Sequence, residues 1–380
     1  MPGIYIHIPF CKQACHYCNF HFSVSQKRKP EFLQALVKEI CLQKDFFTPD
    51  SSQKTNLDTL YIGGGTPSIL SLPEINRIFA EIRKYFELQE EAEITLEANP
   101  DDLTPEKISA LSQTPINRLS IGIQSFQANN LKYMNRSHTP NQALDALQNA
   151  KKEGFKNLTA DLIYGTPGMS DKQWTDNILQ LIKLEVPHIS AYSLTVEKKT
   201  ALDVFIRKGI AKPVEEEQAA RQFDILREIT SNYGYEHYEI SNFALPGYYS
   251  RHNMSYWTGE PYLGLGPSAH SFLPSKRIWN IANTNTYIDE IFKGTIPCEE
   301  ELLSTEQQYN EYIMTALRTM WGIEKKHVEE NFGKNYLEKL MKSSQKHLKN
   351  QNLEDTGTHI LVSIKGKFFS DGIAADLFLV

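Results

Sequence analysis

Short apolar runs alternate in the first half of the chain with segments whose apolar residues recur every three or four positions. The runs are rich in β-branched residues and predict six strands, near residues 4–8, 58–62, 93–97, 118–123, 158–163 and 188–194. The segments between them have amphipathic helical spacing, as in the stripe Ile75, Ile78, Phe79, Ile82 and Phe86. Six consecutive βα units predict an α/β fold, with a parallel sheet curved into an open, partial (β/α)6 TIM-like barrel.

Several of these helices have recognisable starts. Ser71 and Ser170 are each followed three residues later by Glu or Gln, the pattern of a capping box, and Thr104-Pro105 pairs a cap with a first-turn proline. A further apolar helix is expected over residues 30–46. The helical prediction between the strands therefore rests on caps as well as on periodicity.

The pattern changes after residue 300. One apolar-striped helix is expected over Glu306–Trp321, helical runs follow over 325–351, and the tail with Lys367-Phe368-Phe369 favours β-structure. This end should form a small helical domain, with or without a wing. A wing can bind nucleic acid, but the segment has no basic recognition helix, so we favour a packing or lid role.

These patterns divide the chain into three expected parts. They are a barrel over 1–240, a connecting region over 241–299 and a C-terminal helical domain over 300–380.

Composition narrows the class of protein. The 380 residues carry a net charge of -6 with no dense Lys/Arg run, which argues against a nucleic-acid partner. No signal-peptide pattern precedes the first strand and no apolar stretch is long enough to span a bilayer. We expect a cytoplasmic protein without a transmembrane segment, for which peripheral membrane contact stays open.

Three of the five cysteines, Cys11, Cys15 and Cys18, lie together directly after the first strand. Three thiolates at this spacing can hold three irons of a [4Fe-4S] cluster and leave the fourth iron open. A structural zinc site that includes His7, His16 or His21 is the alternative. Zinc modules usually bring two ligand pairs from separated segments, whereas all these candidates are close in sequence, so the cluster is favoured.

The other two cysteines lie far from this loop. Cys41 falls on the expected helix over 30–46 and Cys298 near an expected linker. Each is interpreted as a packed or incidental thiol rather than a fourth ligand.

Unusual residues gather where the expected strands end. Gly63-Gly64-Gly65-Thr66-Pro67 follows strand two, where glycines let a ligand approach the backbone. Glu97, Gln124 and Asp161 are polar residues in or at the end of buried strands, which is costly without a partner. In a parallel barrel these ends share one rim, so we expect the residues to face a polar ligand. For the glycine run, the alternative is a plain tight turn without a function. For the three polar residues, it is a hydrogen bond satisfied inside the protein.

Together these residues resemble radical S-adenosylmethionine (SAM) proteins of the coproporphyrinogen oxidase and HemW group. The resemblance rests on Tyr5-Ile6-His7-Ile8-Pro9-Phe10-Cys11, the CxxxCxxC set, GGGTP and the later Glu, Gln, Arg and Asp positions, and it covers nearly the whole chain. It implies that Cys11, Cys15 and Cys18 ligate a [4Fe-4S] cluster whose open iron binds SAM. By the same resemblance, the positions around SAM are Tyr5, Gly64, Gly65, Thr66, Glu97, Gln124, Arg136 and Asp161.

The resemblance also places Tyr17 against the adenine edge of SAM. The alternative role for this aromatic ring is to shield the cluster from water. The chemistry implied is one-electron reductive cleavage of SAM, in which the cofactor performs the difficult step.

Two departures separate this chain from the porphyrinogen oxidases of the group. Those enzymes have a further cysteine two residues after the third, where this chain has Phe20. They also carry an N-terminal extension over the active site, whereas this sequence begins a few residues before strand one. Both departures count against oxidative decarboxylation of coproporphyrinogen III, which is kept as the alternative function.

A second motif lies in Arg251-His252-Asn253-Met254-Ser255-Tyr256-Trp257, which resembles the HNxxYW pattern of the HemW heme chaperones. Histidine can ligate heme iron and aromatic rings can cover the macrocycle. The resemblance implies a heme site at His252, Asn253, Tyr256 and Trp257, with heme delivered to client hemoproteins, respiratory ones among the candidates. The iron ligand stays open, with Met254 and His270 as further options, and structural packing of these residues is the alternative.

Overall fold

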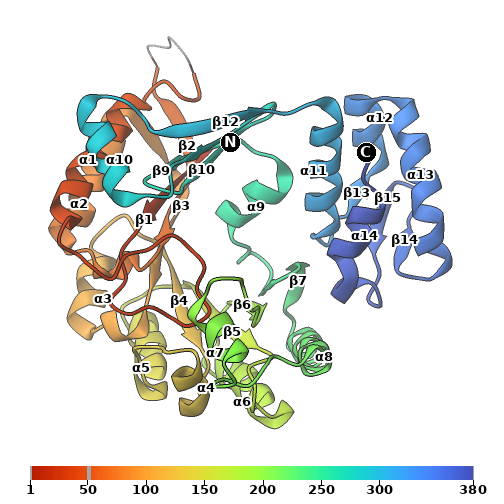
Figure 1. Cartoon of the computed structure of the whole chain (residues 1–380), viewed down its shortest axis with the longest axis horizontal. Helices are drawn as coiled ribbons and strands as arrows, with labels where there is room; N and C mark the ends of the chain where they lie inside the picture. The colour runs from red at the N-terminus through yellow and green to blue at the C-terminus, as the bar shows by residue number, and fades with distance from the viewer. Residues whose placement is uncertain (1, 49–52, 380) are drawn as a thin grey trace.

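The computed structural model describes residues 2–48 and 53–379, and a curved parallel sheet dominates it (Figure 1). The first six strands pair in parallel in sequence order, from β1 with β2 to β5 with β6, which confirms the predicted succession of βα units. The strands are β1 (Gly3–Ile8), β2 (Thr55–Gly64), β3 (Phe86–Ala98), β4 (Arg118–Gln124), β5 (Asn157–Tyr164) and β6 (His188–Ser193).

Helices lie between these strands and after β6. They are α1 (Lys29–Leu42), α2 (Leu72–Tyr85), α3 (Pro105–Ser112), α4 (Ala128–Tyr133), α5 (Pro140–Lys152), α6 (Asp171–Lys183), α7 (Ala201–Arg207) and α8 (Glu216–Asn232). The predicted capping boxes at Ser71 and Ser170 and the cap at Thr104 are present. The stripe on α2 is buried, and its last member, Phe86, already begins β3.

Short strands extend the sheet beyond the six predicted ones, and the full order is β12-β11-β10-β9-β1-β2-β3-β4-β5-β6-β8-β7. Only β9 joins its barrel neighbour in parallel, while the other added pairs are antiparallel. The additions are β7 (Glu236–Glu239), β8 (Asn242–Ala244), β9 (Tyr262–Leu265), β10 (His270–Leu273), β11 (Lys276–Asn280) and β12 (Cys298–Leu302), with helices α9 (Arg251–Thr258) and α10 (Thr284–Lys293) between them.

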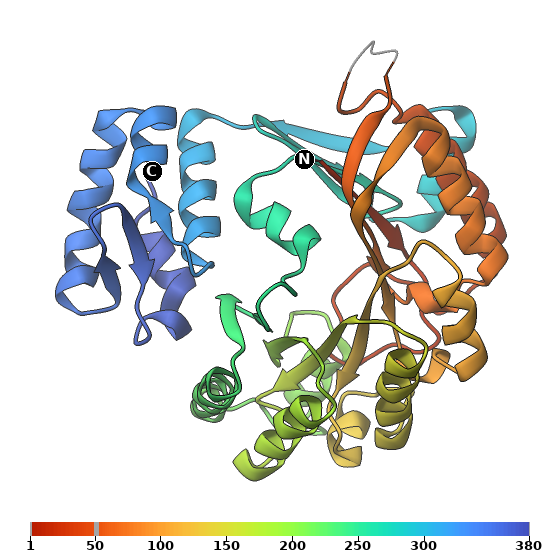
Figure 2. The same ribbon diagram turned by 180° about the vertical axis from the view of Figure 1, so that it is seen from behind.

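The C-terminal segment forms a separate lobe with its own apolar core, and α9 lies between this lobe and the barrel (Figures 1 and 2). A three-stranded antiparallel sheet, ordered β13-β15-β14, accompanies its helices. Its elements are α11 (Thr305–Leu317), β13 (Ile323–Glu324), α12 (Lys325–Phe332), α13 (Lys334–Lys349), β14 (Leu353–Asp355), β15 (His359–Val362) and α14 (Ser370–Asp376). The division of the chain at residues 240 and 299 stays a prediction.

One local prediction is wrong. Lys367–Phe369 forms a short 3-10 helix (η3) rather than β-structure. The Phe368 ring packs 5.9 Å from the ring of Phe223 on α8, so a tertiary contact rather than strand pairing holds this segment.

Among the helices that the described residues form, none combines the length and apolar character needed to cross a membrane.

Candidate functional site

The cysteine loop leaves the carboxyl end of β1 and is closed at its base. The N–H of Cys11 donates to the carbonyl of Ser23 at 3.0 Å, and the N–H of Ser23 donates to the carbonyl of Pro9 at 2.8 Å. From the turn after α4, the side-chain amide of Asn135 donates to the carbonyl of Ala14 at 2.7 Å. The loop is therefore held at its base and in its middle, which limits where its thiols can lie.

The three thiols lie close enough to influence one another electrostatically. The pKa of Cys18 is raised to about 11, mainly by loss of hydration and in part by the charges of Cys15 and Cys11. Loss of hydration also raises the pKa of the buried Cys11. The guanidinium of Arg136 donates to the sulfur of Cys15 at 3.4 Å and favours thiolates nearby. Partly dry thiols beside a fixed cation suit a thiolate-bound centre.

The histidines considered as zinc ligands have other partners. The ring of His7 lies 2.9 Å from the carbonyl of His21 and 3.1 Å from the hydroxyl of Tyr5. His16 bonds the carbonyl of Tyr133, and the His21 ring bonds a threonine hydroxyl on α10, each at 2.9 Å. Within residues 2–48 and 53–379, no three His, Cys, Asp or Glu side chains converge on one metal ion. A four-iron cluster instead takes each thiolate at a different iron.

The glycine turn after β2 packs directly against the cysteine loop. A Cβ on Gly65 would lie 2.7 Å from the carbonyl oxygen of Phe10 and 3.0 Å from the sulfur of Cys11. Gly64 has a φ of 111° and donates its N–H to Glu97 at 3.1 Å. Only glycine tolerates this close approach and this backbone conformation. Thr66, the next residue, is buried beside the same loop.

One cavity of about 630 Å³ brings the predicted rim residues together. Its lining includes Tyr17 and Cys18 from the cysteine loop, Glu97 from β3, Gln124 from β4 and Asp161 from β5. Gln124 has a φ of 62°, a conformation that a non-glycine residue adopts only under local constraint. A thiol, two carboxylates and an amide thus face one space at the carboxyl ends of the strands.

The two carboxylates of this rim hold protons more tightly than usual. Loss of hydration is the main cause, and it raises the pKa of Glu97 to about 7 and that of Asp161 to about 6. Glu97 accepts a hydrogen bond from the hydroxyl of Tyr61 at 2.8 Å, and Asp161 accepts one from Ser120 at 3.3 Å. A cationic or hydroxyl-bearing ligand would supply the compensation that water no longer gives.

Arg136 lies behind the same rim. One of its terminal nitrogens donates to the side chain of Asn99 at 2.7 Å and to the carbonyl of Gly122 at 2.9 Å. Its Nε is buried without a hydrogen-bond partner among the described residues. This unsatisfied donor, the dry carboxylates and the glycine cradle fit a polar cofactor that enters beside the thiols.

The C-terminal lobe closes one side of this cavity. Arg318, Lys367, Phe368 and Asp371 line it together with Tyr192 of β6. Loss of hydration lowers the pKa of Lys367 to about 8. The lobe thus supplies part of the cavity wall, and its role as packing or lid stays a prediction.

The second predicted motif forms α9, and its histidine is buried. His252 is 1% exposed, and its ring nitrogens lie 2.7 Å from the hydroxyl of Thr59 and 2.8 Å from that of Tyr256. Its ring stacks on Tyr61 at 5.1 Å and on Tyr5 at 6.4 Å. Since Tyr61 also donates a hydrogen bond to Glu97, a short chain of contacts joins α9 to the rim of the 630 Å³ cavity.

The other motif residues are half-buried. The N–H of Asn253 donates to the N-cap Ser250 at 3.3 Å, so Asn253 helps to start the helix. Trp257 packs under the guanidinium of Arg318 at 5.2 Å, and its indole N–H is buried without a partner among the described residues. Of the further heme-ligand options, Met254 is half-buried on α9 and His270 is exposed on β10.

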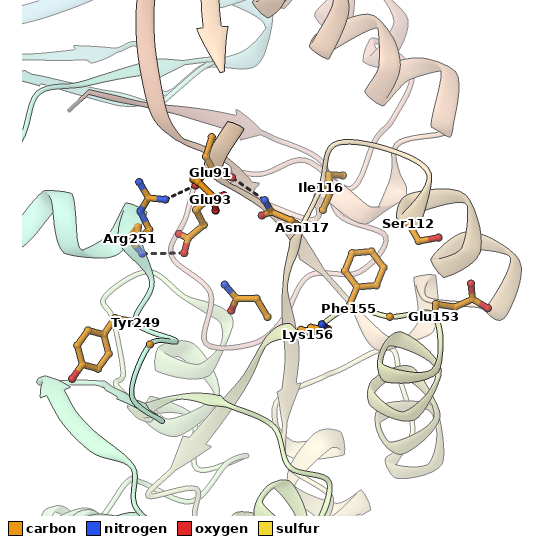
Figure 3. A pocket seen from close by; sticks show the side chains of 14 residues that line it. Glu91, Glu93, Ser112, Ile116, Asn117, Glu153, Phe155, Lys156, Tyr249 and Arg251 are labelled. Carbon is orange, nitrogen blue, oxygen red and sulfur yellow. Dashed lines mark hydrogen bonds between the residues drawn. The ribbon is translucent and has the colours of Figure 1, made fainter. Parts of the chain in front are cut away.

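Two charged residues inside the barrel escaped the sequence interpretation. Glu93 on β3 accepts the N–H groups of Arg251 at 3.1 Å and His252 at 3.0 Å, and so binds the N-terminus of α9. Figure 3 shows Glu93 directed toward Arg251, beside a cavity of about 700 Å³ at the other rim of the barrel. Arg118 on β4 lies 3.8 Å from Glu93, and both are buried. Glu93 and Arg118 could have been identified from the sequence by the criterion that identified Asp161, a charged residue within a predicted buried strand.

Comparisons with known proteins agree with this arrangement. Residues 5–181 match the family model described as Radical SAM superfamily. The chain is 33% identical over 377 residues to "Heme chaperone HemW" of Bacillus subtilis, covering 98% of both chains. It is 35% identical over 355 residues to "Heme chaperone HemW" of Lactococcus lactis subsp. lactis, covering 92% of this chain and 89% of that protein.

The fold also matches that of a solved radical SAM enzyme, coproporphyrinogen III oxidase (HemN) from Escherichia coli. The TM-score is 0.82 at 21% identity, with 99% of this chain and 90% of that chain covered. This likeness concerns the fold, whereas the sequence relatives define the group. The chain belongs to the HemW family within the radical SAM superfamily.

Proposed function

We propose that this protein is a cytoplasmic heme chaperone, which binds heme and a SAM-chelating [4Fe-4S] cluster and delivers the heme to client hemoproteins. The observation that carries the proposal is the position of α9. His252 of its HNxxYW motif stacks on Tyr61, which donates a hydrogen bond to the carboxylate of Glu97 at the cavity rim. The names of the sequence relatives support the same role.

The cluster belongs on Cys11, Cys15 and Cys18. When bound, cluster and SAM supply one-electron chemistry, while the protein supplies position and a dry site. The residues assigned to SAM are Tyr5, Tyr17, Gly64, Gly65, Thr66, Glu97, Gln124, Arg136 and Asp161. Their part is to accept and donate hydrogen bonds, and the glycines give the ligand access to the backbone.

The heme site includes His252, Asn253, Tyr256 and Trp257. Because both ring nitrogens of His252 are hydrogen-bonded, ligation of iron by this residue requires release of the Tyr256 hydroxyl or the Thr59 hydroxyl. His252 also positions Tyr256 for contact with a flat ring. Either role predicts that replacing His252 weakens heme binding.

The proposal is tested on anaerobically reconstituted protein. Replacing Cys11, Cys15 and Cys18 together with serine should abolish cluster absorbance. His252→Ala should weaken hemin binding and leave the cluster intact, while His359→Ala on the C-terminal lobe should change neither. Unchanged hemin affinity in His252→Ala would remove His252 from the site, and absence of hemin binding by the unaltered protein would refute the chaperone role.

The alternative function, anaerobic oxidation of coproporphyrinogen III, is assayed on the same preparation. Turnover to protoporphyrinogen IX would replace the chaperone assignment. Transfer of heme to an apo-hemoprotein without such turnover would support it.

A further inference from the structure

A third cavity lies where α9 meets the C-terminal lobe. It measures about 300 Å³, and its aromatic lining residues are Tyr256, Trp257, Tyr262, Phe272, Tyr312 and Phe332. The first two belong to the HNxxYW motif, while the last two come from α11 and α12. No sequence pattern identified this cavity, because its walls come from segments far apart in the chain.

The walls suit a flat aromatic ligand. Tyr256 meets Tyr262 edge to face at 4.6 Å, and Tyr262 stacks on Phe272 at 6.0 Å. The indole N–H of Trp257 is a buried donor without a partner in the part of the chain that the structure describes. Rings on two sides and an unsatisfied donor favour an extended π-system with polar atoms at its edge.

His327 on α12 provides a nitrogen at this cavity. Its ring is half-buried and stacks on Tyr312 with centroids 4.2 Å apart at 23°. Among the hydrogen bonds of residues 2–48 and 53–379, its backbone carbonyl accepts from Asn331, but neither ring nitrogen takes part in one. His252 differs, since both of its ring nitrogens are bonded. Of these two histidines, His327 is the one ready to ligate a metal.

His270 is the other histidine considered as a ligand of the heme iron. Its exposed ring stacks on Trp279 of β11 at 6.3 Å, and it does not line the cavity. A macrocycle held against Tyr256 and Trp257 therefore has His327, and not His270, among its neighbours.

We propose that heme enters this cavity by one edge and that His327 supplies an axial nitrogen to its iron. This inference rests on the proposed chaperone function and specifies where its cargo binds. The volume is at the lower end of ligand pockets, roughly 300–1,000 Å³. Part of the macrocycle therefore stays uncovered, which suits a protein that must release heme to another. The negative charge of Glu311 in the lining is paired with Arg277, so this carboxylate does not oppose entry of the macrocycle.

The test is a hemin titration of the full chain with its reconstituted cluster, followed by absorption and EPR spectra. His327→Ala should weaken hemin binding at least about tenfold, in the range that loss of metal-site partners produces, and should change the spin-state signature. His270→Ala should bind as the unaltered protein does. Added imidazole should restore the spectrum of His327→Ala, because it replaces the missing ligand.

Metal-free protoporphyrin IX separates ligation from pocket shape. It should bind His327→Ala and the unaltered protein equally, whereas Trp257→Ala should weaken binding of both porphyrins. If the unaltered protein binds hemin and His327→Ala keeps its affinity and spectrum, the inference is wrong while the chaperone function stands. Loss of the axial signature in His252→Ala or His270→Ala instead would also overturn it. If the unaltered protein binds no hemin, the chaperone function itself fails.

Discussion

Replacing Glu93 tests how the barrel holds the HNxxYW motif on α9. Its carboxylate accepts the N–H of Arg251 at 3.1 Å and that of His252 at 3.0 Å, at the positive end of the α9 dipole. The Glu93 carboxylate also lies 3.8 Å from Nε of Arg118. The side chain of Glu93 is 4% exposed and that of Arg118 is 1% exposed. Glu93→Ala removes both hydrogen bonds and leaves a buried cation without its partner.

The expected loss follows from these contacts. Each hydrogen bond to a charged group contributes about 1.5–3 kcal/mol, and breaking a buried ion pair costs about 3–5 kcal/mol. These contributions overlap because they involve one carboxylate, so we expect Glu93→Ala to lower the free energy of unfolding by about 3–5 kcal/mol. Glu93→Gln keeps an acceptor at the helix start and should lose about 1–3 kcal/mol.

Urea unfolding measures the global change, and amide hydrogen exchange of residues 251–258 measures the helix itself. The matched control is Glu91→Gln, which removes the same charge from an exposed position on the same strand and should stay within about 0.5 kcal/mol of the unaltered protein. Equal exchange rates for α9 in the Glu93 and Glu91 variants would refute the anchoring role.

Three further changes have defined outcomes. Glu39 is fully buried and its pKa is raised to about 7, mainly by loss of hydration; between pH 4.5 and 7 the folded protein holds a proton that the unfolded chain has lost. Raising the pH through that window should lower the free energy of unfolding of the unaltered protein by up to about 1.4 kcal/mol per pH unit, relative to that of Glu39→Gln. If the free energies of unfolding of both proteins change with pH in parallel, this prediction is wrong. Gly65→Ala places a Cβ 2.7 Å from a carbonyl of the cysteine loop and should reduce the iron content, whereas Gly372→Ala, with nothing within 4 Å, should not. Tyr61→Phe removes the donor to Glu97 and should weaken SAM binding in calorimetry, while Tyr85→Phe, whose hydroxyl bonds Cys41, should leave it unchanged.

The barrel and its rim were predictable because their signals are local. Apolar period and caps identified the six βα units, and parallel strands end at one rim by geometry alone. Glu97, Gln124 and Asp161 therefore had to lie near each other, and one cavity now contains all three with Cys18. The strands β7–β12 were missed since they are short and mostly antiparallel, with no helical segment between most of them to mark their ends.

What the sequence by itself determined is the order of the elements, the cysteine loop and the chemistry of the rim. The tertiary structure decided what each buried side chain touches. His252 bonds Thr59 from 193 residues away, and Glu93 binds the start of α9 across 159 residues. Periodicity reports whether a position is buried, but a hydrogen bond between distant segments depends on how those segments pack. For that reason the motif was readable from the chain, while the occupied nitrogens of its histidine and the cavity beside His327 were not.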